Sequence, residues 1–263
     1  MMACWRNLSP CIFGQIMPFT TWDKLRDGIG FLLIQLGYHL RQVHGVYPII
    51  KPIDPARLEV LGDPVFQASV REVADLTMLD TARLANLWKL CKLSDPRGNI
   101  LEVGSYRGGG ALHLSNCCPE RKVIVCDSFR GFEALNSTLD KNFSGEMFKD
   151  TNKESVAALF SSRGRKHDVV DGFFPASCIG KSIKPVSFMH LDTDVYKSTI
   201  ESLNYLEREH ILMDRALIVL DDYDREAKGV NQAVGEFTSG CPHWRAFPMF
   251  PGQALLLSAG WFA

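Results

Sequence analysis

The sequence has almost no net charge, no apolar run long enough to cross a membrane, and no cysteines at C-x-x-C spacing. Its 263 residues carry 29 basic and 30 acidic side chains, so no basic field indicates a nucleic-acid or anionic-lipid partner. The apolar run at residues 29–40 is too short to span a bilayer. No internal repeat or low-complexity tract is present. We therefore expect a globular protein with no nucleic-acid partner and no membrane span.

The eight cysteines include no C-x-x-C pair. We therefore interpret them as reduced thiols of a cytoplasmic protein rather than as a disulfide framework or a zinc site. No secretory signal is evident, because Pro10 and Pro18 interrupt the start of the chain. The cysteines are Cys4, Cys11, Cys91, Cys117, Cys118, Cys126, Cys178 and Cys241.

From residue 99 onward, apolar runs alternate with helix-like stretches such as 153–160 and 197–209. This alternation predicts an α/β fold with a doubly wound, mostly parallel sheet. The last two runs are separated only by residues 250–252, which is too short for a crossover helix, so they must form an antiparallel hairpin. The predicted strands are 99–103, 122–126, 168–170, 186–191, 216–220, 244–249 and 253–258.

The N-terminal third has a different pattern. A helix is predicted over 22–43, followed by a proline-rich extended stretch, and a second helix over 80–93 with Asp80 as its N-cap. We predict an N-terminal helical cap over residues 1–85 and the sheet domain over 86–263. A homo-oligomer is left open, with the apolar helix at 22–43 as its candidate interface.

Two acidic clusters follow apolar runs that are predicted to be neighbouring strands. Asp192 and Asp194 end one run, and Asp221 and Asp222 end the other. Ligands of open α/β sheets bind at the carboxyl ends of the strands. Clustered carboxylates repel one another unless a cation lies between them, and Mg²⁺ prefers oxygen ligands of this kind. The clusters predict a metal site at the mouth of the sheet.

A glycine-rich turn follows the first predicted strand, within residues 101–110. Glycine lets a ligand approach the backbone, and the following helix offers free N–H donors. Ser105-Tyr106-Arg107 replaces the second glycine of G-x-G-x-x-G, and no Walker lysine is present, which argues against a nicotinamide site and a P-loop. An ordinary strand-to-helix turn remains the alternative.

Two further motifs are candidates for cofactor contact. Asp127-Ser128 follows the second strand, where an acid can accept hydrogen bonds from a ribose diol; an N-cap is the alternative. Asp171-Gly172-Phe173 follows the third strand, where an aromatic ring can hold adenine or simply pack in the core.

The order of these motifs resembles the macrocin O-methyltransferase family. The resemblance covers about residues 75–240 and rests on three blocks beside the glycine turn and Asp127-Ser128-Phe129. The blocks are Asp192-Thr193-Asp194-Val195-Tyr196-Lys197-Ser198-Thr199, Ile218-Val219-Leu220-Asp221-Asp222-Tyr223 and the run from Gly229 to Phe237.

The resemblance implies a class I S-adenosylmethionine-dependent methyltransferase with a seven-stranded sheet and one reversed strand. It implies Mg²⁺ and a small-molecule hydroxyl acceptor, such as a sugar of a natural product. Carried over by position, the metal ligands are Asp192, Asp221 and Asp222. The implied cofactor contacts are Glu102, Gly104 and Asp127, with Ser105, Arg107, Ser128, Asp171, Gly172 and Phe173 beside them.

For the chemistry, we expect Asp192 to act as both ligand and base, with Asp194 as the second candidate. His190 is expected to be a buried structural residue. Related catechol O-methyltransferases place a lysine base where this chain has Val195, which favours an aliphatic hydroxyl acceptor. The alternatives are a methyltransferase-like enzyme of another chemistry and a non-catalytic binding protein.

Overall fold

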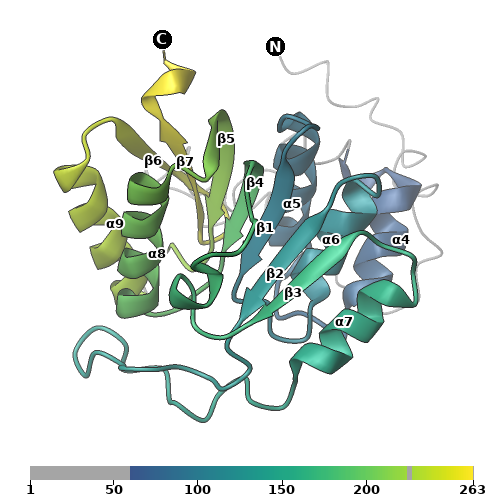
Figure 1. Ribbon diagram of the computed structural model, residues 1–263, viewed down its shortest axis with the longest axis horizontal. Coiled ribbons are helices and arrows are strands. Elements are labelled where there is room, and N and C mark those ends of the chain that lie inside the picture. Colours follow the sequence, from purple (N-terminus) through teal and green to yellow (C-terminus); the bar gives the residue numbers. More distant parts are fainter. Residues whose placement is uncertain (1–59, 224–226, 263) are drawn as a thin grey trace, which may run out of the picture. The chain divides into compact units, whose positions relative to one another are not determined.

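The computed structural model describes residues 60–223 and 227–262 (Figure 1). Contacts within the chain group it into two units, Met1–Gly62 and Asp63–Ala263, and the account below concerns the second. The predicted helix at 22–43 lies outside the described residues. The predicted division between residues 85 and 86 stays a prediction.

The second unit contains a seven-stranded sheet in the order β3-β2-β1-β4-β5-β7-β6. Strands β1 to β5 run parallel, and β7 is antiparallel to both of its neighbours, β5 and β6. The predicted fold class, including the reversed strand near one edge, is confirmed. The strands are β1 Asn99–Val103, β2 Val123–Asp127, β3 His167–Asp171, β4 Val186–Leu191, β5 Leu212–Leu220, β6 Trp244–Met249 and β7 Gln253–Ser258.

Side-chain caps fix the starts of several helices. Asp63, Asp80 and Asn152 each accept a backbone N–H in the first turn of the helix that follows, so the predicted N-cap at Asp80 is confirmed. Two short 3₁₀ turns, Ala176–Cys178 and Ala259–Trp261, complete the described elements. The α-helices are α4 Pro64–Val73, α5 Thr81–Leu93, α6 Gly109–Cys117, α7 Lys153–Ser161, α8 Tyr196–Glu209 and α9 Lys228–Gly240.

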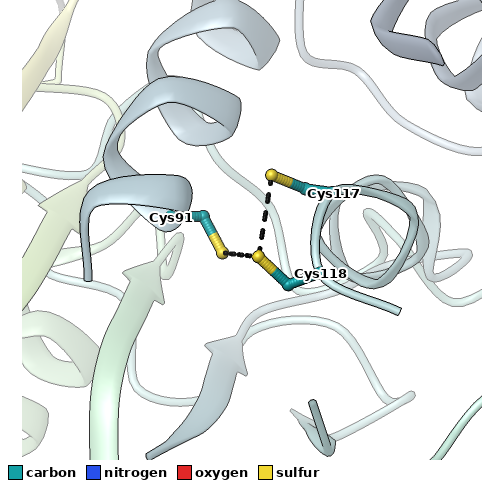
Figure 2. A group of neighbouring side chains, drawn as sticks. All are labelled: Cys91, Cys117 and Cys118. Carbon is teal, nitrogen blue, oxygen red and sulfur yellow. Dashed lines mark hydrogen bonds between the residues drawn. The ribbon is translucent and has the colours of Figure 1, made fainter. Parts of the chain in front are cut away.

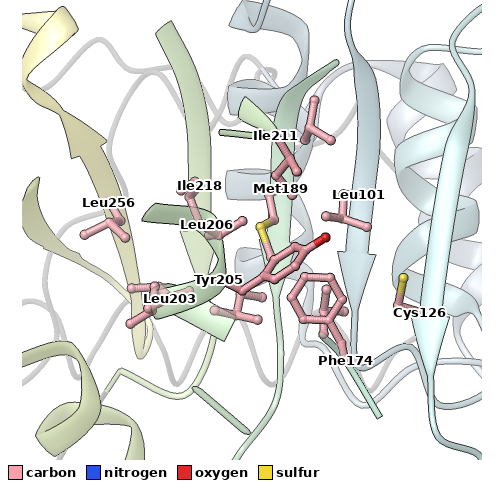
Figure 3. Close-up of a cluster of buried hydrophobic side chains, with 14 of the residues drawn as sticks. Leu101, Cys126, Phe174, Met189, Leu203, Tyr205, Leu206, Ile211, Ile218 and Leu256 are labelled. Carbon is pink, nitrogen blue, oxygen red and sulfur yellow. The ribbon is translucent and has the colours of Figure 1, made fainter. Parts of the chain in front are cut away.

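Helices cover both faces of the sheet (Figure 1). On one face, α8 and α9 pack their apolar sides against strands β1, β4 and β5, and Leu203, Leu206 and Ile218 lie in this layer (Figure 3). On the other face α5 and α6 pack together with α4, which buries Phe66 and Trp88. Strand β4 is buried along its whole length, as expected for a central parallel strand covered on both faces.

The carboxyl ends of the central strands meet through main-chain hydrogen bonds. The Asp192 N–H donates to the Val103 carbonyl at 2.8 Å, and the Asp221 N–H donates to the Leu191 carbonyl at 2.9 Å. These bonds bring the ends of β1, β4 and β5 into one edge of the sheet. Among the described residues, no helix combines the length and apolar character that crossing a bilayer requires.

Candidate active site

A cavity of about 440 Å³ opens at this edge of the sheet. It collects the residues that follow β1, β2, β3, β4 and β5. The predicted site residues that line it are Glu102, Gly104, Ser105, Asp127, Ser128, Gly172, Phe173, Asp192, Asp194, Asp221 and Asp222. Most of the sequence-predicted cofactor contacts and both acidic clusters therefore face one space.

Gly104 is where the end of β1 meets the end of β4. Its φ of +81° lies in the left-handed region, and a Cβ at this position would lie 1.6 Å from the carbonyl oxygen of Asp192. No larger residue fits without moving one of the two strand ends. Glycine at this position thus holds the turn after β1 directly against the acidic cluster after β4.

Beneath this contact, Glu102 and His190 form a buried pair on adjacent strands. Glu102 is 1% exposed and His190 is fully buried, and the His190 Nδ1 lies 2.9 Å from Glu102 Oε1. The other oxygen, Glu102 Oε2, has no hydrogen-bond partner in the described structure. Gly110 leaves room for the pair, because a Cβ there would lie 2.3 Å from Glu102 Oε1.

The four aspartates form two overlapping groups in which the ligand atoms lie within 4.8 Å of one another. Asp192 belongs to both, with His190 and Asp221 in one and with Asp194 and Asp222 in the other. Burial, reinforced by Asp221, raises the pKa of Asp192 well above its usual range, and burial with Asp192 does the same for Asp194. Asp194 and Asp222 both have positive φ, 59° and 54°, so their positions depend on strained turns.

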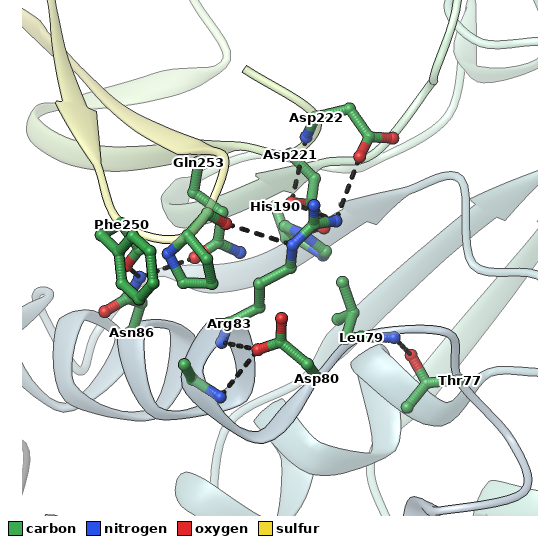
Figure 4. Close-up of polar contacts among 12 residues, drawn as sticks. Thr77, Leu79, Asp80, Arg83, Asn86, His190, Asp221, Asp222, Phe250 and Gln253 are labelled. Carbon is green, nitrogen blue, oxygen red and sulfur yellow. Dashed lines mark hydrogen bonds and ion pairs between the residues drawn. The ribbon is translucent and has the colours of Figure 1, made fainter. Parts of the chain in front are cut away.

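Sequence reasoning missed Arg83, a cation that reaches this cluster from helix α5. Its Nη1 lies 3.1 Å from Asp221 Oδ1 and 3.0 Å from Asp222 Oδ1, and its Nε donates to the Pro251 carbonyl at 3.2 Å (Figure 4). Burial opposes the charge, but Asp221 and Asp222 outweigh it and raise the pKa of Arg83. One arginine therefore ties α5 to both strand-end acids and to the β6–β7 hairpin. Nothing in the sequence marked it, because a helical arginine is usually a surface residue.

Asp127 organises the glycine turn. Its Oδ2 accepts the N–H groups of Ser105 and Tyr106, each at 2.8 Å, and its Oδ1 accepts the N–H of Phe129 at 2.7 Å. No helix begins directly after β2 in the described structure, so the N-cap alternative does not apply. The carboxylate still lines the cavity and keeps acceptor capacity for a ligand hydroxyl.

The long segment between β2 and α7, residues 128–152, forms a wall of the cavity that the sequence did not predict. Phe132 contacts Phe143 and Phe148 edge to face, with ring centroids 5.3 and 5.6 Å apart. Asp140 anchors the segment: its Oδ1 accepts the N–H of Tyr196 at the start of α8, 3.0 Å away. The segment is thus fixed beside the acidic cluster.

Two predicted cofactor contacts do not reach the cavity. Arg107 pairs with Asp150 and lies over the ring of Tyr106, 4.9 Å from its centroid. Asp171 is exposed and lies 3.4 Å from Arg130. Neither side chain is among the residues that line the cavity.

The acidic cluster fits a hard divalent cation. The four aspartates offer carboxylate oxygens only, and Asp221 Oδ2 is a buried oxygen without a hydrogen-bond partner in the described structure. The carboxylates keep a net negative charge after the nearby cations are counted, and they offer oxygen donors only. Both properties suit Mg²⁺. The carboxylates outnumber the two cations that face them, Arg83 and His190: they are Glu102, Asp192, Asp194, Asp221 and Asp222.

Comparison with known proteins agrees with the fold and the motif order. Residues 67–241 match the macrocin O-methyltransferase family (TylF), which is more than half of the chain. The chain belongs to this family. Membership identifies it as an S-adenosylmethionine-dependent O-methyltransferase, as the resemblance implied. No curated sequence matches it.

Solved structures support the fold. The O-methyltransferase NovP superposes with a TM-score of 0.61 at 18% identity, over 70% of this chain and 82% of NovP. The calicheamicin methyltransferase CalS11 gives 0.53 at 17% identity, over 92% of this chain and 94% of its own. At these identities the likeness extends to the fold alone.

Proposed function

We propose that this family member transfers a methyl group from S-adenosylmethionine to a hydroxyl of a sugar or another natural product, assisted by a divalent cation. The observation that carries the proposal is the contact between Gly104 and the Asp192 carbonyl. It brings the glycine turn and the acidic cluster to the walls of one cavity. A cofactor on the turn and an acceptor at the acids would then meet across a short distance, which is the main requirement for an in-line displacement.

The cofactor half of the cavity is formed by β1, β2 and β3. Asp127 accepts hydrogen bonds from the turn and retains lone pairs for a ribose diol, and Glu102 lies deeper, toward the acids, where the amino-acid end of the cofactor would bind. Phe173 lines the same wall and offers a ring face to the adenine, with Arg130 5.7 Å above it. The sulfonium would then point toward Asp192.

The acceptor half is formed by the acidic cluster. We assign Asp192, Asp221 and Asp222 as the metal ligands, with Asp194 within reach. A bound Mg²⁺ would lower the pKa of the acceptor hydroxyl and orient it. Arg83 and His190 each lie within ion-pair distance of Asp221, which fixes its position whether or not a cation is present.

Asp192 is the proposed proton acceptor, with Asp194 second. Both carboxylates line the cavity beside the other strand-end acids, within reach of a hydroxyl that binds there. No lysine is available at the catechol-type position, since Val195 is buried there and Lys197 is on helix α8 facing Glu201. This set suits an aliphatic hydroxyl. The sugar acceptor is further supported by CalS11, described as a TDP-rhamnose 3′-O-methyltransferase.

The test is calorimetric titration of the full chain with S-adenosylmethionine, with Mg²⁺ and after chelation, followed by turnover with nucleotide sugars and glycosylated natural products. Micromolar affinity, a binding free energy of about −8 kcal/mol, is expected for a working cofactor site. Loss of turnover in Asp221→Asn with cofactor binding retained would support metal assistance. Asp214→Asn, an exposed acid on the same strand, is the matched control. Unchanged turnover in Asp221→Asn would refute the metal, and no cofactor binding would favour a non-catalytic role.

A further inference from the structure

Three cysteines that are scattered in the sequence meet between helices α5 and α6. Cys91 lies in the last turn of α5, Cys117 ends α6 and Cys118 follows it (Figure 2). The Cys118 Sγ lies 3.8 Å from Cys91 Sγ and 3.9 Å from Cys117 Sγ, and all three sulfurs lie within 4.8 Å of one another. We call Cys91, Cys117 and Cys118 the thiol cluster.

A buried cation without a carboxylate partner lies beside the thiol cluster. Arg121 is 4% exposed, and in the described part of the chain it forms no ion pair. Among the described residues, its guanidinium donates to six acceptors, all neutral, including Ser94 Oγ at 2.8 Å and Ser187 Oγ at 2.7 Å. Asp95, whose pKa it helps to lower, is bound by Arg97 instead. A buried, uncompensated charge is costly, so this position favours an anion.

The nearest groups that can become that anion are the thiols. Arg121 Nη1 lies 3.8 Å from Cys91 Sγ. The hydrogen bonds that Cys118 shares with Cys117 and Cys91, together with Arg121, lower the pKa of Cys118. The contacts with Cys118 and burial raise the pKa of Cys91 and Cys117, so Cys118 is the first of the three to ionise. The thiolate is the form that binds metal ions.

We propose that the thiol cluster is a binding site for a single soft divalent cation of the Zn²⁺ class. Zinc–thiolate bonds of about 2.3 Å in tetrahedral geometry place the sulfurs about 3.8 Å apart. The two sulfur separations at Cys118 already match that value. Three thiolates with one divalent cation leave one negative charge, which the single charge of Arg121 balances. Each thiol that binds gives up its proton to solvent, so the affinity should rise with pH.

The thiol cluster is separate from the methyltransferase cavity. Arg121 donates to the carbonyls of Gly98 and Asn99, at the start of β1, whereas Gly104 at the other end of that strand lines the cavity. The length of this strand separates the two by about 15 Å. Cys117 and Cys118 are each 9% exposed, so the thiol cluster lies close to the surface, and a water would be the fourth ligand of a tetrahedral cation.

The test is an oxygen-free titration of the reduced full chain with Cd²⁺, a spectroscopic substitute for Zn²⁺, followed by its thiolate-to-metal absorption in the ultraviolet. One equivalent should bind in the native chain and in Cys241→Ser, a matched control that changes a partly exposed cysteine outside the cluster. Cys91→Ser and Cys118→Ser should each weaken binding by about 100-fold, since losing an outer-shell partner alone typically costs about 10- to 100-fold. With saturating Mg²⁺ present for the acidic cluster, methyl transfer should not depend on the added Cd²⁺.

Three results would overturn the proposal: no absorption band in the native chain, unchanged affinity in Cys118→Ser, or a cluster found as a disulfide whose reduced form binds nothing. If a serine variant fails to fold, alkylation of the native chain with and without Cd²⁺ decides instead. Cd²⁺ should protect Cys91, Cys117 and Cys118 and leave Cys241 reactive. Protection of other cysteines in their place would refute the site.

Discussion

Two fully buried histidines in this protein have pKa values shifted in opposite directions. His190 lies at the acidic edge of the sheet. Burial lowers its pKa, but Asp221 and Glu102 outweigh burial and raise the value to about 10. His113 lies on α6 between Phe66 and Trp88, and burial lowers its pKa to about 4. The pair shows that the charge of the neighbours, and not burial by itself, decides which protonation state a buried group adopts.

The same contrast distinguishes the two regions that hold these histidines. At the acidic edge, the carboxylates outnumber Arg83 and His190, so negative charge is in excess and a hard cation fits. Between α5 and α6, Arg121 is buried with thiols and neutral acceptors, so positive charge is in excess and the Cys118 thiolate is favoured. The proposed hard-cation site and the proposed soft-cation site would lie about one strand length apart.

The largest effect is expected from Asp192→Asn, which removes the carboxylate common to both acidic groups. Turnover should fall about 10³-fold, because a ligand and the proposed proton acceptor are lost together. The affinity for S-adenosylmethionine should stay close to that of the native chain, since the substitution leaves the backbone contact to Gly104 in place. Single-turnover kinetics and calorimetry measure the two quantities. A turnover within about tenfold of the Asp214→Asn control would show that the excess negative charge has no catalytic use.

The acidic edge was largely predictable from the sequence, for a physical reason. Strand ends are marked by apolar runs, and the parallel sheet brings successive ends to one edge, so Asp127, Asp192 and Asp221 had to converge. All seven predicted strands are present, three of them starting or ending one to four residues away from the expected positions. The hairpin of β6 and β7 followed from the length of its connection.

What the sequence could not predict are contacts made by loops and helix faces. Arg83 reaches Asp221 because α5 crosses the cavity edge, and no periodicity encodes that crossing. The aromatic wall at 128–152 has no regular pattern, and only the tertiary structure shows Asp140 anchoring it. The thiol cluster was missed because Cys91 and Cys117 are 26 positions apart, far from the spacing of a local metal motif.

The second prediction concerns His113 and the pH dependence of stability. Its folded pKa of about 4 lies below the unfolded value of 6.5, so the stabilisation is present above pH 6.5 and is lost as the pH falls toward 4. The loss should reach about 3 kcal/mol across this window. Urea unfolding from pH 7.5 to 4 measures it. His113→Gln should flatten the change, while His167→Gln, a partly exposed histidine on β3, should leave it in place. If the free energy of unfolding changed equally with pH in both variants, the lowered pKa of His113 would be refuted.

A smaller effect is expected for Arg83→Met, which removes a cation from the acidic edge. Stability without divalent cations should fall by about 2 kcal/mol, because Asp221 and Asp222 lose a charge-assisted partner. Millimolar Mg²⁺ should restore more stability to this variant than to the native chain. Thermal unfolding with Mg²⁺ and after chelation provides the measurement, and Arg215→Met, an exposed arginine on β5, is the control. If Mg²⁺ left the unfolding temperature of Arg83→Met unchanged, the acids would not bind the ion.

The smallest effect separates two buried serines in the region of α5 and α6. Ser94 Oγ accepts from Arg121 Nη1 at 2.8 Å and donates to the Cys91 carbonyl at 2.7 Å, whereas Ser115 Oγ has no partner within the described residues. Ser94→Ala should cost about 1 kcal/mol, because Arg121 loses one of its shortest hydrogen bonds, and Ser115→Ala should be neutral or slightly stabilising. Chemical denaturation of both variants gives the comparison. Equal costs would mean that Arg121 finds other acceptors, which would weaken the argument that its charge needs a thiolate.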